Sequence, residues 1–225
     1  MKVRYLGHAC FEFVAEKRIL IDPFISQNPL CPIKLEELAE PDIILVTHGH
    51  ADHLGDAIEI SKKTGATIVA IHEVAIHAQL KGAVAEGMNI GGSISLEGVN
   101  IYMTEAKHSS AIDTNISGGH ATGFVFGLEG KHIYHAGDTG IFRDMKLIGK
   151  LFDIYLALLP IGDRYTMGVK HAAIATKMLK PKYVIPMHYN TFPVIQQNPE
   201  EFKKLAEEES KAKVLILKPG EEIEL

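Results

Sequence analysis

The chain has 225 residues, of which 46% are hydrophobic and 23% are charged, and its net charge is −5. This composition is typical of a globular protein, and without a Gly/Ser-rich or Pro-rich linker it predicts one domain over residues 1–225. The acidic balance offers no basic surface for a polyanion, so nucleic acid is not an expected partner.

The N-terminal residues lack the apolar core of a signal peptide. The longest apolar run, residues 154–161, is far shorter than the roughly 20 residues that span a bilayer. Cys10 and Cys31 are isolated and lack CxxC spacing, which is typical of reduced thiols. We therefore expect a cytoplasmic protein with no membrane partner.

The first half of the chain predicts strands alternating with helices, an order typical of α/β architecture. A hairpin ends at Asp22, and a later run of apolar residues without alternation predicts a strand buried on both faces. The expected strands are residues 2–6, 11–14, 18–21, 43–46 and 67–71, and the expected helices are near 34–39, at 54–64 and around 73–81.

The second half resembles the first: both run hairpin, Asp, helix, proline, buried strand, His, which indicates an internal pseudo-twofold. Under such symmetry Asp22, His48, Asp138 and His188 would lie at strand ends on one edge, where α/β proteins bind ligands. The expected strands here are residues 101–104, 123–128, 131–135, 183–185 and 214–217, and the expected helices are 169–179 and 199–210.

Three histidines and one aspartate are concentrated in the stretch THGHADH, residues 47–53. His48 and His50 are two residues apart, so extended backbone points both imidazoles the same way, while Asp52 and His53 come as the chain turns into a helix. HxHxDH should arise by chance on the order of once per thousand chains of this composition. The arrangement suits two metal ions better than one, since a single structural zinc site would more often use cysteines.

Further ligands must come from elsewhere in the chain. His108 in EAKHSS, Asp138 in HAGDTG and His188 in IPMHYN each follow a predicted strand. Singly, each is more typical of a structural residue, but together they would complete a dinuclear site.

These motifs are specific to a known family. HxHxDH followed by a lone His, a GD and a final His resembles the metallo-β-lactamase superfamily. GHACF, ILIDPF, YHAGDTGIF and VIPMHYNTFP resemble the UPF0173-type metal-dependent hydrolases, close to the ascorbate-6-phosphate lactonases. The resemblance covers residues 3–217 and implies a four-layer αβ/βα sandwich with two pseudo-symmetric halves.

The same resemblance implies roles for individual residues. Asp138 would bridge two metals, and Asp22 would support the site without binding metal. One metal would be held by His48, His50 and His108, and the other by Asp52, His53 and His188.

Two such ions roughly 3.5–4 Å apart can share a water and lower its pKa toward about 7. The bridging hydroxide would be the nucleophile, and Asp52 could orient it and carry its proton to the leaving group. We expect zinc first, although manganese, iron and nickel accept the same ligands. The expected function is hydrolysis of a small-molecule substrate, an ester, a lactone or a phosphate-bearing metabolite.

Alternative functions are a phosphodiesterase or nuclease on the same scaffold and a non-catalytic metal-binding protein. A redox enzyme like the superfamily's diiron flavoproteins would carry Glu in place of His50. Family analogy allows a homo-oligomer.

Three residues carry weaker signals. His8 could support the site or be a buried structural histidine. His120 could line the pocket, and Arg164 could bind an anion through its forked guanidinium. The segment Val169, Lys170 and His171 departs from similar proteins, which often carry an acidic residue or proline there.

Overall fold

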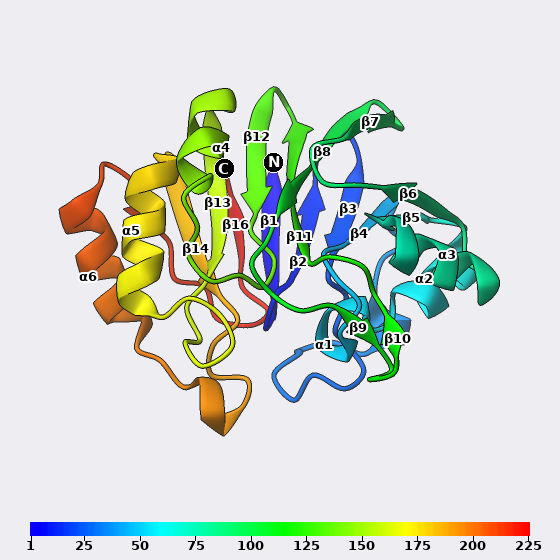
Figure 1. Ribbon diagram of the computed structural model, residues 1–225. Coiled ribbons are helices and arrows are strands. Elements are labelled where there is room, and N and C mark those ends of the chain that lie inside the picture. The colour runs from blue at the N-terminus through cyan, green and yellow to red at the C-terminus, as the bar shows by residue number, and fades with distance from the viewer.

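The computed structural model describes residues 1–225 and contains two seven-stranded sheets with helices on their outer faces (Figure 1). The first sheet has the order β16-β1-β2-β3-β4-β5-β6, and the second β15-β14-β13-β12-β11-β8-β7. The strands of the first are β1 (Lys2–Gly7), β2 (Cys10–Val14), β3 (Arg18–Ile21), β4 (Ile43–Val46), β5 (Thr67–Ile71), β6 (Ala85–Met88) and β16 (Glu222–Glu224). Those of the second are β7 (Ser93–Leu96), β8 (Val99–Glu105), β11 (Thr122–Leu128), β12 (Lys131–His135), β13 (Ile154–Pro160), β14 (Tyr183–Met187) and β15 (Lys213–Val214).

Short elements and helices complete the chain. β9 (Ala111–Ile112) and β10 (Ile116–Ser117) form a separate hairpin. The helices are α1 (Ala51–Leu54), α2 (Ala57–Thr64), α3 (His72–Leu80), α4 (Met145–Leu151), α5 (Val169–Leu179), α6 (Pro199–Glu209) and the 3₁₀ turns η1 (Leu35–Glu37) and η2 (Pro193–Ile195). None of the helices has the length and hydropathy that a transmembrane span requires.

The layers follow from side-chain alternation along the strands. In β13, Leu156 and Leu158 belong to the core between the two sheets, whereas Ala157 and Leu159 belong to the core beneath α4, α5 and α6. Successive strand residues point to opposite faces, so a strand buried on both faces must be apolar throughout. Helices α2 and α3 cover the other sheet (Figure 1). The predicted four-layer αβ/βα sandwich is confirmed.

The central elements lie where the sequence predicts them, but several details differ. The expected strand at 214–217 is only the two-residue β15, which pairs with β14 at Lys213 and Val214 alone. The expected helix near 34–39 is only a three-residue 3₁₀ turn, and the expected helix at 54–64 is two helices, α1 and α2. The two halves also differ by one strand: β4 pairs with β3 directly, whereas β13 lies between β12 and β14. His48 and His188 therefore do not follow equivalent strands.

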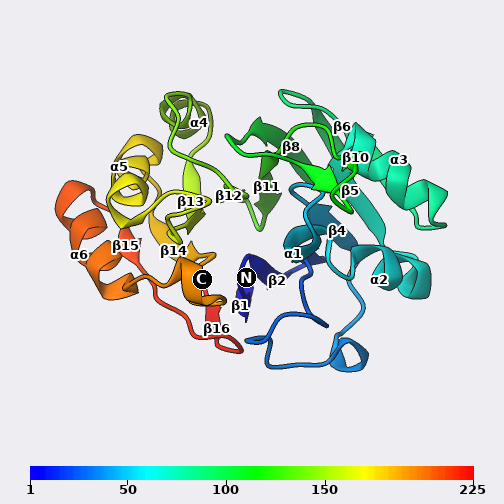
Figure 2. The same ribbon diagram turned by 60° about the horizontal axis from the view of Figure 1, so that its bottom comes forward.

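One edge of the sandwich collects the ends of many strands. β3 to β6 are parallel to one another, as are β12 to β15, so their C-terminal ends reach the same edge. β1 and β8 run in the same direction as these strands, because each is separated from its sheet's parallel set by one antiparallel strand. Figure 2 brings this edge forward, with α1 near its middle between the two sheets.

Candidate metal centre

The predicted ligands converge at this edge from both sheets. Three groups of side chains offer nitrogen or oxygen atoms that lie within 4.8 Å of one another: His48, His50 and His108; His8, Asp52, His53 and His188; and His48, His53 and Asp138. The first two groups match the two ligand sets that the family resemblance implies, with His8 added to the second. The third joins Asp138 to one histidine of each set.

Asp138 follows β12 and is central to the cluster. One carboxylate oxygen, Oδ1, lies 3.3 Å from Nε2 of His53. The other oxygen, Oδ2, lies 3.0 Å from Nε2 of His188 and 3.6 Å from Nε2 of His108. A carboxylate with its two oxygens near histidines of both ligand sets has the geometry that a bridging ligand needs.

Asp22 orients two histidines of the motif. Its carboxylate accepts hydrogen bonds from Nδ1 of His53 at 2.7 Å and from the hydroxyl of Thr47 at 2.7 Å. Because the Thr47 hydroxyl has only one proton, it accepts from Nδ1 of His48, 3.1 Å away. Both imidazoles therefore carry the proton on Nδ1, which leaves Nε2 free as a metal ligand. Asp22 thus contacts one histidine of the motif directly and a second through Thr47, and the supporting role expected of it stays a prediction.

Burial sets the protonation of the first group. Burial lowers the pKa values of His48, His50 and His108 below the ordinary histidine value. These imidazoles are therefore neutral near pH 7, and a neutral imidazole has the lone pair that binds a metal. Nε2 of His48 lies 2.9 Å from Nδ1 of His50, close enough for both to contact one ion.

His53, in the second group, is charged in the metal-free protein. Burial opposes the charged form of His53, but the carboxylates of Asp138 and Asp22 outweigh it and raise its pKa well above the ordinary value. Burial also opposes ionisation of Asp138, but His188 and His53 hold its pKa well below the usual range. A divalent cation could replace the His53 proton between these carboxylates.

Unpartnered atoms test whether these residues suit a metal. His53 Nε2, Asp138 Oδ1 and both ring nitrogens of His188 are buried and have no hydrogen-bond partner. Buried polar atoms are rarely left without a partner, because their desolvation is then uncompensated. His53 Nε2 and Asp138 Oδ1 lie within 3.3 Å of each other, so a cation between the residues would satisfy both. The cluster therefore fits a metal site.

The backbone turns sharply to deliver these side chains. His8, Asp22 and His188 have φ angles of 59°, 46° and 54°, in the left-handed region that non-glycine residues rarely adopt. Gly137, with φ 61°, precedes Asp138, and a Cβ there would overlap the carbonyl oxygen of Thr122. Left-handed residues cluster at functional sites, where the surrounding structure maintains them.

A cavity of about 330 Å³ opens over the cluster, and its lining includes Ser109 and Tyr165. The other lining residues are the predicted ligands His50, Asp52, His108, Asp138 and His188. Of the two residues proposed to contact substrate, Arg164 is exposed, with its guanidinium 5.7 Å from the centre of the Tyr165 ring. His120 is exposed and does not line this cavity. Arg164 therefore does not line this cavity, whereas its neighbour Tyr165, which the sequence did not single out, does.

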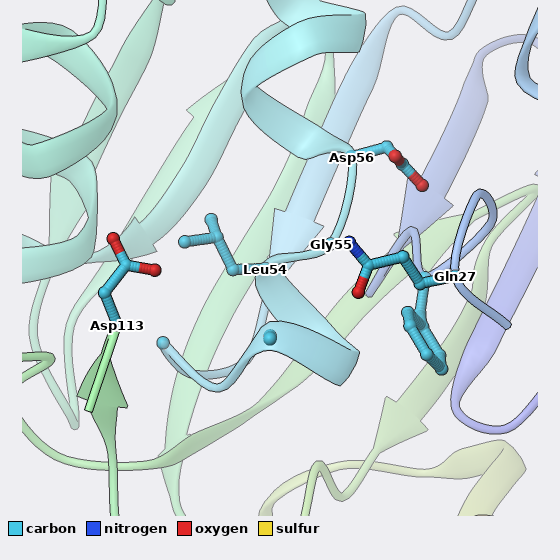
Figure 3. A pocket seen from close by; sticks show the side chains of 8 residues that line it. Gln27, Leu54, Gly55, Asp56 and Asp113 are labelled. Atoms are coloured by element: carbon cyan, nitrogen blue, oxygen red, sulfur yellow. The ribbon is translucent and has the colours of Figure 1, made fainter.

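A second cavity, of about 210 Å³, borders the turn between α1 and α2 (Figure 3). Leu54, Gly55 and Asp56 form one side, and Gln27 and Asp113 are also at its wall. Asp56 accepts backbone hydrogen bonds in the neighbouring loop, from Ile25 and Ser26. None of the predicted ligands lines this cavity, so the chemistry belongs to the one above the cluster.

Known proteins share this fold and sequence. A family model described as a beta-lactamase superfamily domain matches residues 17–189. A UPF0173 metal-dependent hydrolase of Methanosarcina barkeri is 55% identical over 228 residues, covering 100% of this chain and 99% of that protein. The one from Thermococcus onnurineus is 54% identical over 228 residues, covering 100% of each chain.

Solved structures of related proteins have the same fold. Igni18, a metallo hydrolase from the hyperthermophilic archaeon Ignicoccus hospitalis, has 44% sequence identity and a TM-score of 0.91, with 99% of this chain and 97% of that chain covered. YhfI from Bacillus subtilis, a metallo-beta-lactamase fold protein, has 14% identity and a TM-score of 0.76, with 99% of each chain covered. The second likeness shows the fold alone.

The sandwich fold and its edge cluster of histidines and aspartates define a metal-dependent hydrolase with the metallo-β-lactamase fold. Within that superfamily the chain belongs to the UPF0173 metal-dependent hydrolases. The resemblance that the sequence motifs indicated is therefore confirmed, as is the expectation of a hydrolase.

Proposed function

We propose that this metal-dependent hydrolase uses two divalent ions to cleave a small ester, lactone or phosphate-bearing metabolite. The observation that carries the proposal is the set of unpartnered buried atoms of His53, Asp138 and His188, beside a cavity that Asp138 and His188 line. Two ions are proposed because two of the ligand groups share no residue: the triad of His48, His50 and His108, and the tetrad of His8, Asp52, His53 and His188.

The proposed ligands fall into two sets around Asp138. Zinc is the first candidate, and manganese, iron and nickel accept the same nitrogen and oxygen donors. His48, His50 and His108 would hold one ion, Asp52, His53 and His188 the other, and Asp138 both. When bound, the ions would acidify a shared water and polarise the oxygen of the attacked bond.

We infer that Asp52 moves the proton. Its side chain is 32% exposed and lines the cavity, whereas two histidines near its Oδ2, His8 and His188, are almost fully buried. His8 and His53 outweigh the effect of burial and hold the pKa of Asp52 below its ordinary value, so the carboxylate is ionised at neutral pH. An ionised carboxylate at the cavity can accept a proton from the attacking water and deliver it to the leaving group.

The cavity volume and its walls limit the substrate. A space of about 330 Å³ suits a small molecule. Ser109 and Tyr165 line the wall without being proposed ligands, and their hydroxyls can hydrogen-bond to the substrate. We propose a small-molecule substrate, a cytoplasmic location and, by family analogy, a homo-oligomer, with no nucleic-acid or membrane partner.

The proposal is tested by measuring metal per chain on the purified protein and then assaying lactones, carboxylic esters, thioesters, phosphomonoesters and phosphodiesters with each metal restored. We expect two ions per chain and turnover of a small ester, lactone or phosphate ester. Turnover of phosphodiesters alone would favour the phosphodiesterase alternative, and a chain that binds no transition metal would refute the proposed site.

A further inference from the structure

His8 lies within the cluster but belongs to neither of the two ligand sets that the family resemblance implies. It is fully buried and follows β1 with a left-handed backbone. Nε2 lies 3.1 Å from Oδ2 of Asp52, and Nδ1 lies 2.9 Å from the hydroxyl of Thr191. Its ring also packs against that of His188 at a tilt of 45°, with 4.0 Å between ring centroids.

The backbone of His8 holds the same neighbours in place. Its carbonyl oxygen accepts the backbone N–H of His188 at 2.7 Å and the hydroxyl of Tyr5 at 3.0 Å. One residue thus contacts the loop that carries His188 and the helix that carries Asp52. These two segments come from different sheets, so His8 connects the ligands of the second ion across the sandwich.

His8 differs from the neighbouring proposed ligand histidines in that its ring nitrogens have hydrogen-bond partners. His53 Nε2 and His188 Nε2 have no partner, which is expected of atoms that face a metal. Both ring nitrogens of His8 have one. Although His8 lies close enough to join the second group of potential ligands, its nitrogens are already used.

The direction of the hydrogen bond to Asp52 follows from the chemistry of the acceptor. An ionised carboxylate can only accept, so Nε2 of His8 must carry a proton. This donation restrains the Asp52 carboxylate from the side on which its Oδ2 also lies 4.0 Å from Nε2 of His188, so the carboxylate is held toward the second ligand set. The Thr191 hydroxyl holds the other side of the ring and prevents it from rotating.

We propose that His8 is a positioning residue: it donates to Asp52, orients that carboxylate toward the second metal ion, and is not itself a ligand. This inference rests on the proposed two-metal site. Partners of this kind typically contribute 10- to 100-fold in metal affinity.

The test compares His8→Asn with His8→Gln. Asparagine tolerates the left-handed backbone but is too short to reach Asp52, whereas glutamine can extend an amide N–H toward it. With zinc titrated against a chromophoric chelator, we expect His8→Asn to bind the second ion about 10- to 100-fold more weakly and glutamine to recover part of that loss. Thr191→Val, which removes only the hydroxyl behind the ring, should weaken the same ion to a smaller extent.

His171, an exposed histidine of α5, supplies the matched control, and His171→Asn should bind both ions as the unmodified protein does. Unchanged affinity for both ions in His8→Asn and Thr191→Val would overturn the inference. A cobalt(II) spectrum of fully loaded His8→Gln with fewer coordinating nitrogens would also overturn it, because His8 would then be a ligand. If the unmodified protein binds fewer than two ions, the proposed function fails instead.

Discussion

Asp138 lies between the histidines of the two proposed ligand sets, and its negative charge is close to both. Its oxygens are 3.3 Å from His53 and 3.0 Å from His188, and it is buried. In the proposed two-metal site, a buried carboxylate in this position would compensate both cations, which no histidine could do. We therefore expect the loss of this residue to affect the centre more than the loss of any single imidazole.

Asp138→Asn should reduce bound metal from two ions to at most one per chain and lower kcat/KM by at least about 100-fold. The amide keeps the shape but removes the negative charge between the ions. Metal analysis of the purified variant and steady-state assays would check this, with the exposed Asp144→Asn as the control. Full two-metal occupancy with normal turnover would contradict the bridging role.

Tyr165 is the aromatic residue at the wall of the metal cavity, and its side chain is half-exposed. Because it does not contact the ligand set through any hydrogen bond, its removal should leave metal binding unchanged. We expect Tyr165→Ala to raise KM about 10-fold. Tyr165→Phe, which keeps the ring and removes only the hydroxyl, shows how much of that effect comes from each. Assays of both variants on the substrate identified by the panel would check this, and an unchanged KM in both would remove Tyr165 from the binding site.

At the scale of elements, the turn after β12 connects the sheet to the site. The neutral ring of His135 accepts the backbone N–H of Gly137 at 3.1 Å and donates to the carbonyl of Ala9 at 3.0 Å. This pattern requires one protonated and one free ring nitrogen. The strand end, the glycine turn and Asp138 are thus held together by one neutral imidazole.

That geometry predicts a pH dependence of stability. Burial lowers the pKa of His135 below its unfolded value of about 6.5. A lowered histidine pKa contributes stability that is present above the unfolded pKa and is lost as the pH falls below it toward the folded pKa. Below about pH 6.5 the free energy of unfolding should therefore fall more steeply in the unmodified protein than in His135→Gln, by at most about 1.4 kcal/mol per pH unit. Urea unfolding between pH 5 and pH 8 would measure the two slopes, and equal slopes would contradict the role of His135.

The elements themselves were largely predictable from local patterns. β3, β4, β5 and β12 have the predicted bounds, because alternation or continuous apolarity marks a strand directly. β7 was not predicted, since its residues alternate only between exposed and half-buried. β13 was seen only as an apolar run, and its position between β12 and β14 depends on pairing that no local window contains.

At the scale of the whole molecule, the cluster joins the two sheets. The HGHADH motif belongs to the half that forms the first sheet, and His108, Asp138 and His188 follow strands of the second. Backbone contacts support the junction, for example the N–H of Thr122 donating to the carbonyl of Thr47 at 3.0 Å. A metal held by both halves should therefore stabilise the entire fold.

Removal of metal with a chelator should lower Tm by roughly 10 °C, and restoring the native ion should recover it. An ion that binds only the folded state stabilises it by about 4 kcal/mol at a thousand times its Kd, and each kcal/mol shifts Tm by roughly 2–4 °C for a chain of this size. Calorimetry of the metal-free and reconstituted protein would check this. An unchanged Tm would show that the ions do not link the two halves.

The sequence by itself determined the family, the sandwich and the identities of the proposed ligands, because metal-ligand residues at fixed spacing after apolar strands are local signals. Only the tertiary structure decided how these residues are supported. Thr47 bonds to Asp22, and Thr191 to His8, across 25 and 183 positions of the chain. A threonine carries no chemical signal of its own, so its role exists only once folding places a partner beside it.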